Sequence, residues 1–311
     1  MRGMFSDACW SYFAGSKSMT DPLSPATAPF SPPGLLASLP PPPPGRTGWP
    51  WTVETSPDDY GTPPTSGRWP KLCIVCPSFR QGRFIEETLR SVLLQNYPAL
   101  EFIVIDGGSD DETVPTLQKY SPWLTHWESQ PDRGQSHALN KGFTHTTAEL
   151  FGWINSDDYY LPGAFAALAR RAKPGRMKRL FYGHHMQFDE STGRREAIRV
   201  PKVFAFEIYA GGFTLPSHAT FWTAAAHQPF DESLQFIMDA DLFKRITAAG
   251  AQVVRVDATL GVARLHQASK TATISGQGHV ETQQWLARMT KRHWWLLWQC
   301  HRVLRRLRRM V

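Results

Sequence analysis

The chain has 311 residues, of which 41% are hydrophobic, and carries a formal net charge of +7 at pH 7. Seven lysines and arginines, with no acidic residue among them, lie between Lys291 and Val311, so the rest of the chain is nearly neutral. This distribution argues against a nucleic-acid partner, because the positive charge belongs to a tail and not to the face of a domain.

The first 68 residues form a proline-rich segment. Fourteen of the 25 prolines precede residue 65, and no amphipathic period runs through them. Such a segment buries too little apolar surface to offset the entropy lost on ordering. Residues 1–68 are therefore predicted to be disordered or polyproline-like, although a start codon assigned too far upstream would explain the same composition. No signal peptide is predicted, because a clean apolar core behind basic residues is missing.

From residue 69 onward, apolar runs alternate with segments of helical spacing. Apolar runs without polar alternation indicate parallel strands that are covered on both faces. Strands are predicted over 72–76, 102–105, 125–128 and 150–154, and helices over 83–95, 113–120, 135–144 and 162–172. This order predicts an α/β domain with a doubly wound, mostly parallel sheet, in which ligands bind at the carboxyl ends of the strands.

The later part of the chain is predicted to extend this domain to residue 275. Strands are expected over 180–188, 195–200 and 253–256, and a helix over 239–249. Residues 276–311 are predicted to form a basic amphipathic helix. Its apolar stripe comprises Leu296, Cys300, Val303, Leu304 and Leu307, with Trp294, Trp295 and Trp298 beside it. Such a helix suits the surface of an anionic membrane, or packing against the domain or a partner.

Cys73 and Cys76 have the CxxC spacing of metal and redox sites, but they lie in a predicted strand. Residues i and i+3 of a strand face opposite sides, so the two thiols are expected to diverge into the core. A reducing compartment is the simplest inference. No apolar stretch reaches 18 residues, so no spanning helix is predicted. We expect a cytoplasmic protein, peripheral on the inner face of the membrane through the C-terminal helix.

Two loops at predicted strand ends carry carboxylates. Asn155-Ser156-Asp157-Asp158 follows one strand, and Asp106-Gly107-Gly108-Ser109 follows another. Carboxylates at strand ends supply oxygen ligands for a hard divalent cation, and glycines let the backbone approach a ligand closely. Each loop taken alone also fits a turn that caps the next helix.

Together and in this order, these loops and five other segments resemble the family 2 glycosyltransferases with the GT-A fold. The resemblance covers about residues 71 to 272. Its segments are Cys76–Phe79, Ser91–Pro98, Glu101–Ser109, Asp132–Gly142, Gly152–Asp158, Phe230–Leu234 with Met238–Leu242, and Leu265–Thr271. It implies a GT-A domain over 69–275, with the later strands on the acceptor side. It also implies inverting hexosyl transfer from a nucleotide-diphospho-sugar, a UDP-sugar, to a glycan or lipid-linked acceptor.

The resemblance also implies roles for single residues. The donor would contact Pro77, Ser78, Phe79, Asp106, Gly108, Arg133, Asn140, Asn155, Ser156 and Lys270. Asp157 matches the last position of the family's DxD motif and would hold a divalent metal, Mn²⁺ or Mg²⁺, with His266 completing the site. Asn155 replaces the usual first Asp, which would lower the metal affinity.

Asp239 matches the family's general base, which takes a proton from the acceptor hydroxyl. Met238 stands where Glu is common, and this departure leaves the base between Asp239 and Asp241. Side chains that are two residues apart on a helix differ in direction by about 200°, so only one of these carboxylates can face the cleft. His218 would face the sugar or the acceptor, or serve a structural role.

Two other functions are weighed against transfer. A catalytically degenerate relative would bind a nucleotide sugar or a partner without turnover, and Asn155 and Met238 keep this alternative open. A sugar nucleotidyltransferase would need a Gly-rich, Arg-containing loop directly after the first strand, which Pro77–Gly82 does not provide.

Overall fold

The structure is a computed structural model that describes residues 34–63, 67–172, 175–209 and 214–287. All of them belong to one compact unit. The strands are β1 (Leu72–Ser78), β2 (Leu100–Asp106), β3 (His126–Ser129), β4 (Leu150–Trp153), β5 (Tyr159–Tyr160), β6 (Arg179–Asp189), β7 (Arg195–Ile198), β8 (Thr220–Thr223) and β9 (Gln252–Leu265).

The α-helices are α1 (Ile85–Leu93), α2 (Thr113–Tyr120), α3 (Gln135–Phe143), α4 (Ala164–Ala169), α5 (Ala205–Tyr209), α6 (Met238–Ala248), α7 (Lys270–Thr273) and α8 (Ser275–Ala287). Short 3₁₀ helices span Pro57–Tyr60, Ser121–Trp123, Ser217–Ala219 and Ala224–Ala226.

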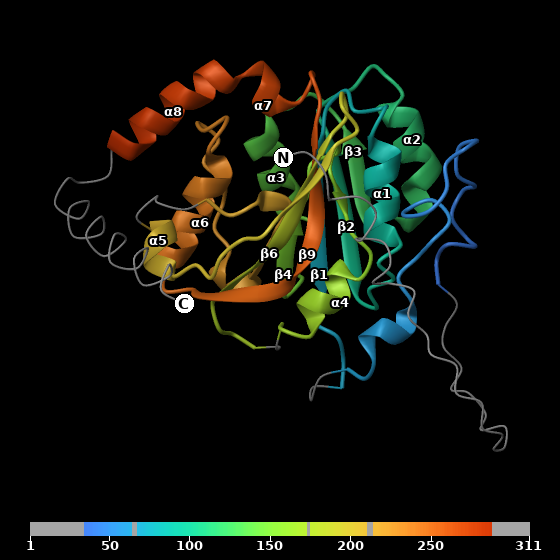
Figure 1. Ribbon diagram of the computed structural model, residues 1–311, viewed down its shortest axis with the longest axis horizontal. Helices are drawn as coiled ribbons and strands as arrows, with labels where there is room; N and C mark the ends of the chain where they lie inside the picture. Colours follow the sequence, from blue (N-terminus) through green and yellow to red (C-terminus); the bar gives the residue numbers. More distant parts are fainter. Residues whose placement is uncertain (1–33, 64–66, 173–174, 210–213, 288–311) are drawn as a thin grey trace, which may run out of the picture. The chain divides into compact units, whose positions relative to one another are not determined.

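One nine-stranded sheet organises the domain (Figure 1). Its order is β3-β2-β1-β4-β8-β6-β9-β5, and β7 pairs with β6. The first four strands in this order are parallel, as the apolar runs predict. The pairs β4·β8, β6·β8, β6·β7 and β5·β9 are antiparallel, so the later part of the sheet is mixed.

Strand β1 divides two hydrophobic cores, one on each face of the sheet. Leu72, Ile74 and Cys76 pack into the core beneath α1, α2 and α4, whereas Cys73 and Val75 pack into the core beneath α3 and α6. Both thiols are buried and free on opposite faces, so the expected divergence of the CxxC pair is confirmed. Burial raises the pKa of the Cys73 thiol to about 12, so this thiol stays protonated and unreactive near neutral pH.

The long strand β9 pairs in parallel with β6 from Arg179 to Asp189. The register shifts on either side of His184, and such irregularities bend and twist paired strands. Beyond the shift, the pair Gln187 and Ala263 borders the cavity described below, together with Arg264. The β6·β9 ribbon therefore closes one side of the ligand-binding end of the sheet.

The prediction of disorder over residues 1–68 is wrong for residues 34–63, while residues 1–33 lie outside the described part. Leu39, Trp51 and Tyr60 from this segment are buried. The Arg90 side chain, fully buried on α1, donates from Nε to the Pro50 carbonyl oxygen at 2.9 Å. It also donates to the carbonyls of Pro40 and Trp51, both at 2.8 Å. Proline-rich backbone is ordered here because a buried guanidinium supplies its hydrogen-bond donors.

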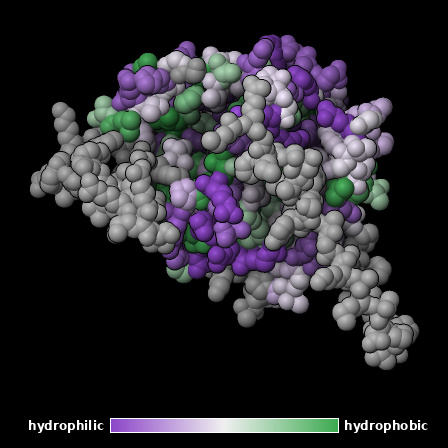
Figure 2. Space-filling model, viewed as in Figure 1, coloured by the Kyte–Doolittle hydropathy of each residue, from purple (hydrophilic) through white to green (hydrophobic). Residues whose placement is uncertain are grey.

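The membrane-binding prediction for residues 276–311 falls mostly on residues outside the described part. Helix α8 occupies the beginning of this range, whereas the apolar stripe and the tryptophans follow residue 287. Among the described residues, no helix has both the length and the apolar character needed to cross a membrane. Hydrophilic residues cover most of the described surface in the view of Figure 2, with hydrophobic residues in small groups between them.

Candidate active site

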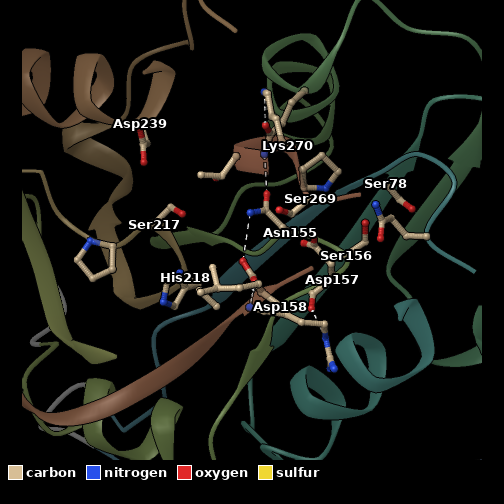
Figure 3. Close-up of a pocket in the computed structure, with 18 of the residues that line it drawn as sticks. Ser78, Asn155, Ser156, Asp157, Asp158, Ser217, His218, Asp239, Ser269 and Lys270 are labelled. Atoms are coloured by element: carbon tan, nitrogen blue, oxygen red, sulfur yellow. Dashed lines mark hydrogen bonds between the residues drawn. The ribbon is translucent and has the colours of Figure 1, made fainter. Parts of the chain in front are cut away.

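A cavity of about 1140 Å³ opens at the carboxyl ends of β1 and β4. Its wall also includes residues of α3, of the β6·β9 ribbon, of the start of α6 and of the segment around α7. Nine sequence-predicted site residues lie in this wall, namely Pro77, Ser78, Phe79, Asn155, Ser156, Asp157, His218, Asp239 and Lys270. Figure 3 shows Asp239 extending from α6 toward the open space, with Asn155 to Asp158 on another wall.

The end of β1 and the loop after it offer polar atoms without partners among the described residues. Ser78 Oγ and Gln81 Oε1 are buried side-chain atoms with no hydrogen-bond partner among the described residues, and both residues line the cavity. Phe79 lies in the same wall with 53% of its surface exposed. Buried polar atoms normally have partners, so a ligand with hydrogen-bonding groups and a flat ring would complete this corner.

Asp106 does not line the cavity, contrary to its predicted donor contact. Its buried carboxylate accepts hydrogen bonds from the Ser109 backbone N–H at 2.8 Å and from the Ser129 hydroxyl at 2.6 Å. It also accepts from the Gly108 backbone N–H at 3.2 Å. Gly108 adopts φ +85° to make this turn, and its neighbour Gly107 borders the cavity instead. Asp106 thus shapes the loop from behind.

Arg133 and Asn140 also lie outside the cavity wall. Arg133 Nη2 contacts Glu232 Oε2 at 2.6 Å, and its side chain is 69% exposed. The Asn140 amide donates to Glu232 Oε1 at 3.1 Å and accepts from the Phe230 backbone N–H at 2.7 Å. Both side chains therefore hold the loop at 230–232, which leads toward α6.

A chain of hydrogen bonds crosses the cavity floor (Figure 3). Lys270 Nζ donates to Gln135 Oε1, and Gln135 Nε2 donates to Asn155 Oδ1, each at 2.6 Å. Asn155 Nδ2 in turn donates to Asp158 Oδ2 at 3.1 Å, and Asp158 Oδ1 accepts from the Arg264 backbone N–H at 2.9 Å. The departure at Asn155 therefore has a structural use, because an amide can accept from one neighbour and donate to the next.

Changing Asn155 to Asp is expected to destabilise the metal-free protein by about 1–3 kcal/mol. A carboxylate cannot donate to Asp158, and the two acidic groups would face each other across the present 3.1 Å contact. Burial and the neighbouring Asp157 already raise the pKa of Asp158. Urea denaturation at pH 7 measures the effect, and unchanged stability would contradict this role of the amide.

Asp157 and His266 come together as the metal hypothesis requires. His266 Nε2 lies 3.0 Å from Asp157 Oδ2, and both side chains are largely buried. Asp157 borders the cavity, whereas His266 lies behind it against the Phe84 ring, at 4.5 Å between ring centroids. No group of three or more His, Cys, Asp or Glu side chains suited to a metal occurs among the described residues. One carboxylate and one imidazole still fit Mn²⁺ or Mg²⁺ when phosphate oxygens and water supply the other ligands.

The structure separates the two candidate bases on α6. Asp239 lines the cavity, and its carboxylate accepts a hydrogen bond from the Ala240 backbone N–H at 2.7 Å. Asp241 points elsewhere, since it pairs with Arg245 Nε at 2.6 Å and accepts from Trp285 Nε1 at 3.0 Å. Burial raises the pKa of Asp239 to about 6, whereas backbone N–H donors and the charge of Lys270 act in the opposite direction. Asp239 is therefore the carboxylate that can reach a ligand.

Met238, the second departure from the family pattern, does not face the cavity. Its side chain is 2% exposed in the core beneath α3 and α6, where Ser136 Oγ lies 3.0 Å from its sulfur. A glutamate at this position would have to enter an apolar environment. The methionine therefore removes no acidic group from the cavity wall.

His218 forms a pair with His185 on the wall opposite the loop after β1. His218 Nε2 lies 3.1 Å from His185 Nδ1, and both residues border the cavity. Burial and the neighbouring His185 lower the pKa of His218 to about 3. The pair is therefore neutral at physiological pH and suits hydrogen bonding to hydroxyl groups better than proton transfer.

Sequence reasoning assigned no site role to several residues of the wall, among them Gln81, Gln135, His185 and Arg264. Gln135 lies inside the Asp132–Gly142 segment of the resemblance, which could have identified it. Arg264 contacts the Asp157 carbonyl oxygen from Nε at 3.0 Å and Glu87 from Nη2 at 2.8 Å. These contacts join positions more than 100 residues apart in the chain, so no local sequence pattern predicts them.

Comparison with known proteins agrees with this geometry. Residues 73–234, just over half of the chain, match the family model described as glycosyl transferase family 2. An uncharacterized glycosyltransferase of Mycobacterium tuberculosis is 33% identical over 108 residues, which are 34% of this chain and 41% of the relative. The GalNAc(5)-diNAcBac-PP-undecaprenol beta-1,3-glucosyltransferase of Campylobacter jejuni is 30% identical over 110 residues, 34% of this chain and 36% of the relative. The alignments thus span about two fifths of these relatives.

Two solved structures share the fold. S. aureus TarS 1-349 in complex with UDP-GlcNAc superposes with a TM-score of 0.54 at 18% identity, covering 65% of this chain and 61% of TarS. The mannosyltransferase PcManGT from Pyrobaculum calidifontis, in complex with GDP-Man and Mn²⁺, gives 0.55 at 18% identity, covering 74% and 68%. The GT-A architecture expected from the sequence is therefore confirmed.

Proposed function

Because the chain belongs to glycosyl transferase family 2, we propose that it transfers a hexose from a UDP-sugar to a hydroxyl of a glycan or lipid-linked acceptor. The observation that carries this proposal is the arrangement around one cavity. Asp239 projects into it from α6, and the Asn155–Asp158 loop borders it from the end of β4. A base and a leaving-group site on separate walls are what a displacement at a sugar carbon requires.

The donor half of the proposal rests on the loops after β1 and β4. The free Ser78 hydroxyl and the Gln81 amide oxygen suit the hydrogen-bonding edge of a uracil ring, and Phe79 supplies an exposed aromatic surface. Lys270 offers a cation to the diphosphate. Relatives of known structure hold UDP-GlcNAc or GDP-Man, so their donors fall in the same chemical class.

The metal half rests on Asp157 and His266, which lie 3.0 Å apart. A divalent ion bound there would neutralise the charge that develops on the departing diphosphate. Arg264 donates from Nε to the Asp157 backbone carbonyl oxygen, and this contact anchors the loop that carries the carboxylate. The Mn²⁺ in the complex of the archaeal mannosyltransferase supports the choice of ion.

In the transfer step, Asp239 accepts the proton of the acceptor hydroxyl as that oxygen attacks the anomeric carbon, and the bond from this carbon to the diphosphate oxygen breaks to release UDP. A single base on the side opposite the leaving group gives inversion of the anomeric configuration. The neutral His185–His218 pair contributes hydrogen bonds to hydroxyls on the acceptor side. The lipid-linked alternative for the acceptor draws support from the name of the Campylobacter relative.

Calorimetric binding of UDP, with and without Mn²⁺, tests the donor site. We expect Mn²⁺-dependent binding that weakens at least about tenfold when Asp157 is changed to Ala, since a lost metal or charged contact costs about 1.4 kcal/mol or more. Glu196→Ala, an exposed carboxylate on β7 paired with Arg194, is the matched control and should bind as wild type.

Each alternative gives a different result in this experiment. Binding that depends on neither Mn²⁺ nor Asp157 would contradict the metal site. Binding of GDP or dTDP in place of UDP would correct the nucleotide. Tight UDP binding without hydrolysis or transfer of any UDP-sugar would favour a catalytically degenerate relative. If UDP, GDP and dTDP all fail to bind, the donor site is overturned.

Peripheral attachment to an anionic membrane is proposed from the sequence after residue 287, which the described part does not include. The tryptophans and arginines between Trp294 and Arg309 motivate it. The full chain is expected to float with vesicles that contain anionic lipid, whereas a chain ending at residue 290 should not. Equal flotation of the two chains would contradict the proposal.

A further inference from the structure

Helix α6 carries Asp239 but lacks a cap of its own. The residue at its N-cap is Ile237, whose side chain cannot accept a hydrogen bond, and no side-chain cap bond forms there within the described part of the chain. The N–H groups at a helix start need acceptors, and Ser, Thr, Asp or Asn usually supply them from the N-cap position. The start of α6 therefore depends on an acceptor from elsewhere.

Glu281 of α8 supplies an acceptor for the N–H of the N-cap residue Ile237 and for the two N–H groups that precede it. Its carboxylate accepts hydrogen bonds from the backbone N–H groups of Gln235 and Phe236, both at 2.8 Å, and of Ile237 at 2.9 Å. Three successive N–H groups that converge on one carboxylate form an anion-binding nest. The anion is in this case a side chain 44 residues later than Ile237.

Three further contacts join α8 to α6 and its preceding loop. Trp285 Nε1 donates to Asp241 at 3.0 Å, and Lys244 Nζ lies 4.8 Å from the centre of the Trp285 ring. Gly278 packs so closely on Phe236 that an added Cβ would lie 2.4 Å from a ring carbon. In Figure 1, α7 and α8 follow β9. These contacts fix α8 against α6 and its preceding loop, and Glu281 meets the segment that leads directly into Asp239.

We propose that Glu281 is a positioning residue for catalysis, which sets the direction of Asp239 by anchoring the backbone immediately before α6. This proposal rests on the proposed transferase function. It adds Glu281, a residue outside the cavity wall, to the residues on which transfer depends. Misplacing a catalytic group by about 1 Å can cost about 100-fold in rate. Asp239 is only two residues beyond Ile237, the last residue whose N–H Glu281 binds. If residues 235–237 become more mobile, the position of Asp239 should therefore change with them.

The test compares three substitutions at Glu281 with one control. Glu281→Ala removes the acceptor, Glu281→Asp withdraws it by one methylene, and Glu281→Gln keeps a neutral acceptor of the same length. Gln283→Ala, an exposed residue on the same helix, is the control. For each variant, kcat and KM are measured with the active UDP-sugar, UDP affinity by calorimetry, and deuterium uptake in peptides that cover residues 234–243.

We expect kcat to fall about 10- to 100-fold in Glu281→Ala. UDP affinity should stay within about twofold of wild type, because Glu281 does not line the cavity. Deuterium uptake over residues 234–243 should rise in the same variant. Glu281→Asp should lie between Glu281→Ala and wild type, Glu281→Gln should restore most of kcat, and Gln283→Ala should match wild type.

Faster deuterium uptake with unchanged kcat would overturn the positioning role. So would equal losses of kcat and UDP affinity, which indicate general disruption of the domain. If Glu281→Ala does not fold, the positioning role is judged instead from the kcat values of Glu281→Asp and Glu281→Gln relative to wild type. If wild type transfers no sugar but the Glu281 variants still alter uptake, the transferase function fails while the contact stands.

Discussion

Replacing Asp239 with Asn is expected to lower kcat about a thousandfold, because general base catalysis contributes about 10²- to 10⁴-fold. Asn keeps the size and one acceptor oxygen of the side chain but cannot take the proton of an acceptor hydroxyl. UDP affinity should remain near wild type, because the loops after β1 and β4 are untouched. Steady-state kinetics with the UDP-sugar, together with calorimetry of UDP, measures both quantities.

The stability of Asp239→Asn distinguishes a loss of catalysis from a loss of the folded state. The folded pKa of Asp239, about 6, lies above its ordinary value, so the folded state favours the protonated form. The stability that this provides is present at low pH and is lost as pH rises through about 6. Removing the charge should therefore leave Asp239→Asn at least as stable as wild type at pH 7. A marked fall in melting temperature would contradict this account of the site.

The pH dependence of wild-type activity follows from the same group. The base must be ionised to act, so kcat/KM should fall as pH is lowered through about 6. Asp241→Asn is the matched control on the same helix, since Asp241 faces Arg245 and Trp285 and not the cavity. It should keep kcat within a few-fold of wild type. A thousandfold loss in Asp241→Asn, with Asp239→Asn active, would reverse the assignment.

Replacing Arg90 with Met is expected to destabilise the domain by about 3–5 kcal/mol, because each carbonyl oxygen left without its donor costs about 1–3 kcal/mol. Methionine fills most of the volume but leaves the carbonyl oxygens of Pro40, Pro50 and Trp51 without their donors. Chemical denaturation should give a lower free energy of unfolding. Limited proteolysis should cut within residues 34–63 sooner than in wild type.

Arg170→Met is the control for this substitution. Arg170 is exposed and reaches the same segment only at the Asp59 carbonyl oxygen, at 3.5 Å. Its loss should change stability by about 0.5 kcal/mol or less. If both variants behave alike, the buried guanidinium does not order the N-terminal segment, and apolar burial of Leu39, Trp51 and Tyr60 would be the cause instead.

The first half of the sheet could be predicted because its signals are local. Each parallel strand is a short apolar run, and Leu72 to Cys76 alternates between two cores that both exclude water. Strand β8 was not predicted, since it has four residues and is defined by its neighbours β4 and β6. The order in residues 34–63 was missed for the same reason, because Arg90 supplies the donors from a distant helix.

The cavity could be predicted in outline but not in the role of each residue. The family motifs indicate which loops meet, and nine of the predicted residues border one cavity. They do not indicate whether a polar group faces a ligand or supports a turn, as Asp106 and Asn140 do. Periodicity indicates that only one of Asp239 and Asp241 faces the cleft, and contacts from α8 and Arg245 decide which one.

The long strand β9 is synthesised late, and this affects how the domain folds during translation. The cavity joins Ser78, near the start of the sheet, to Arg264 and Lys270, which follow almost 200 residues later. Synthesis at about 5–20 residues per second separates these segments by roughly 10 s or more. Until β9 and α7 leave the ribosome, the early strands lack the part of the wall that Arg264 and Lys270 provide. A ligand that needs Lys270 as well as the loops after β1 and β4 would therefore stabilise the completed domain more than the nascent chain, because all of its contacts exist only there.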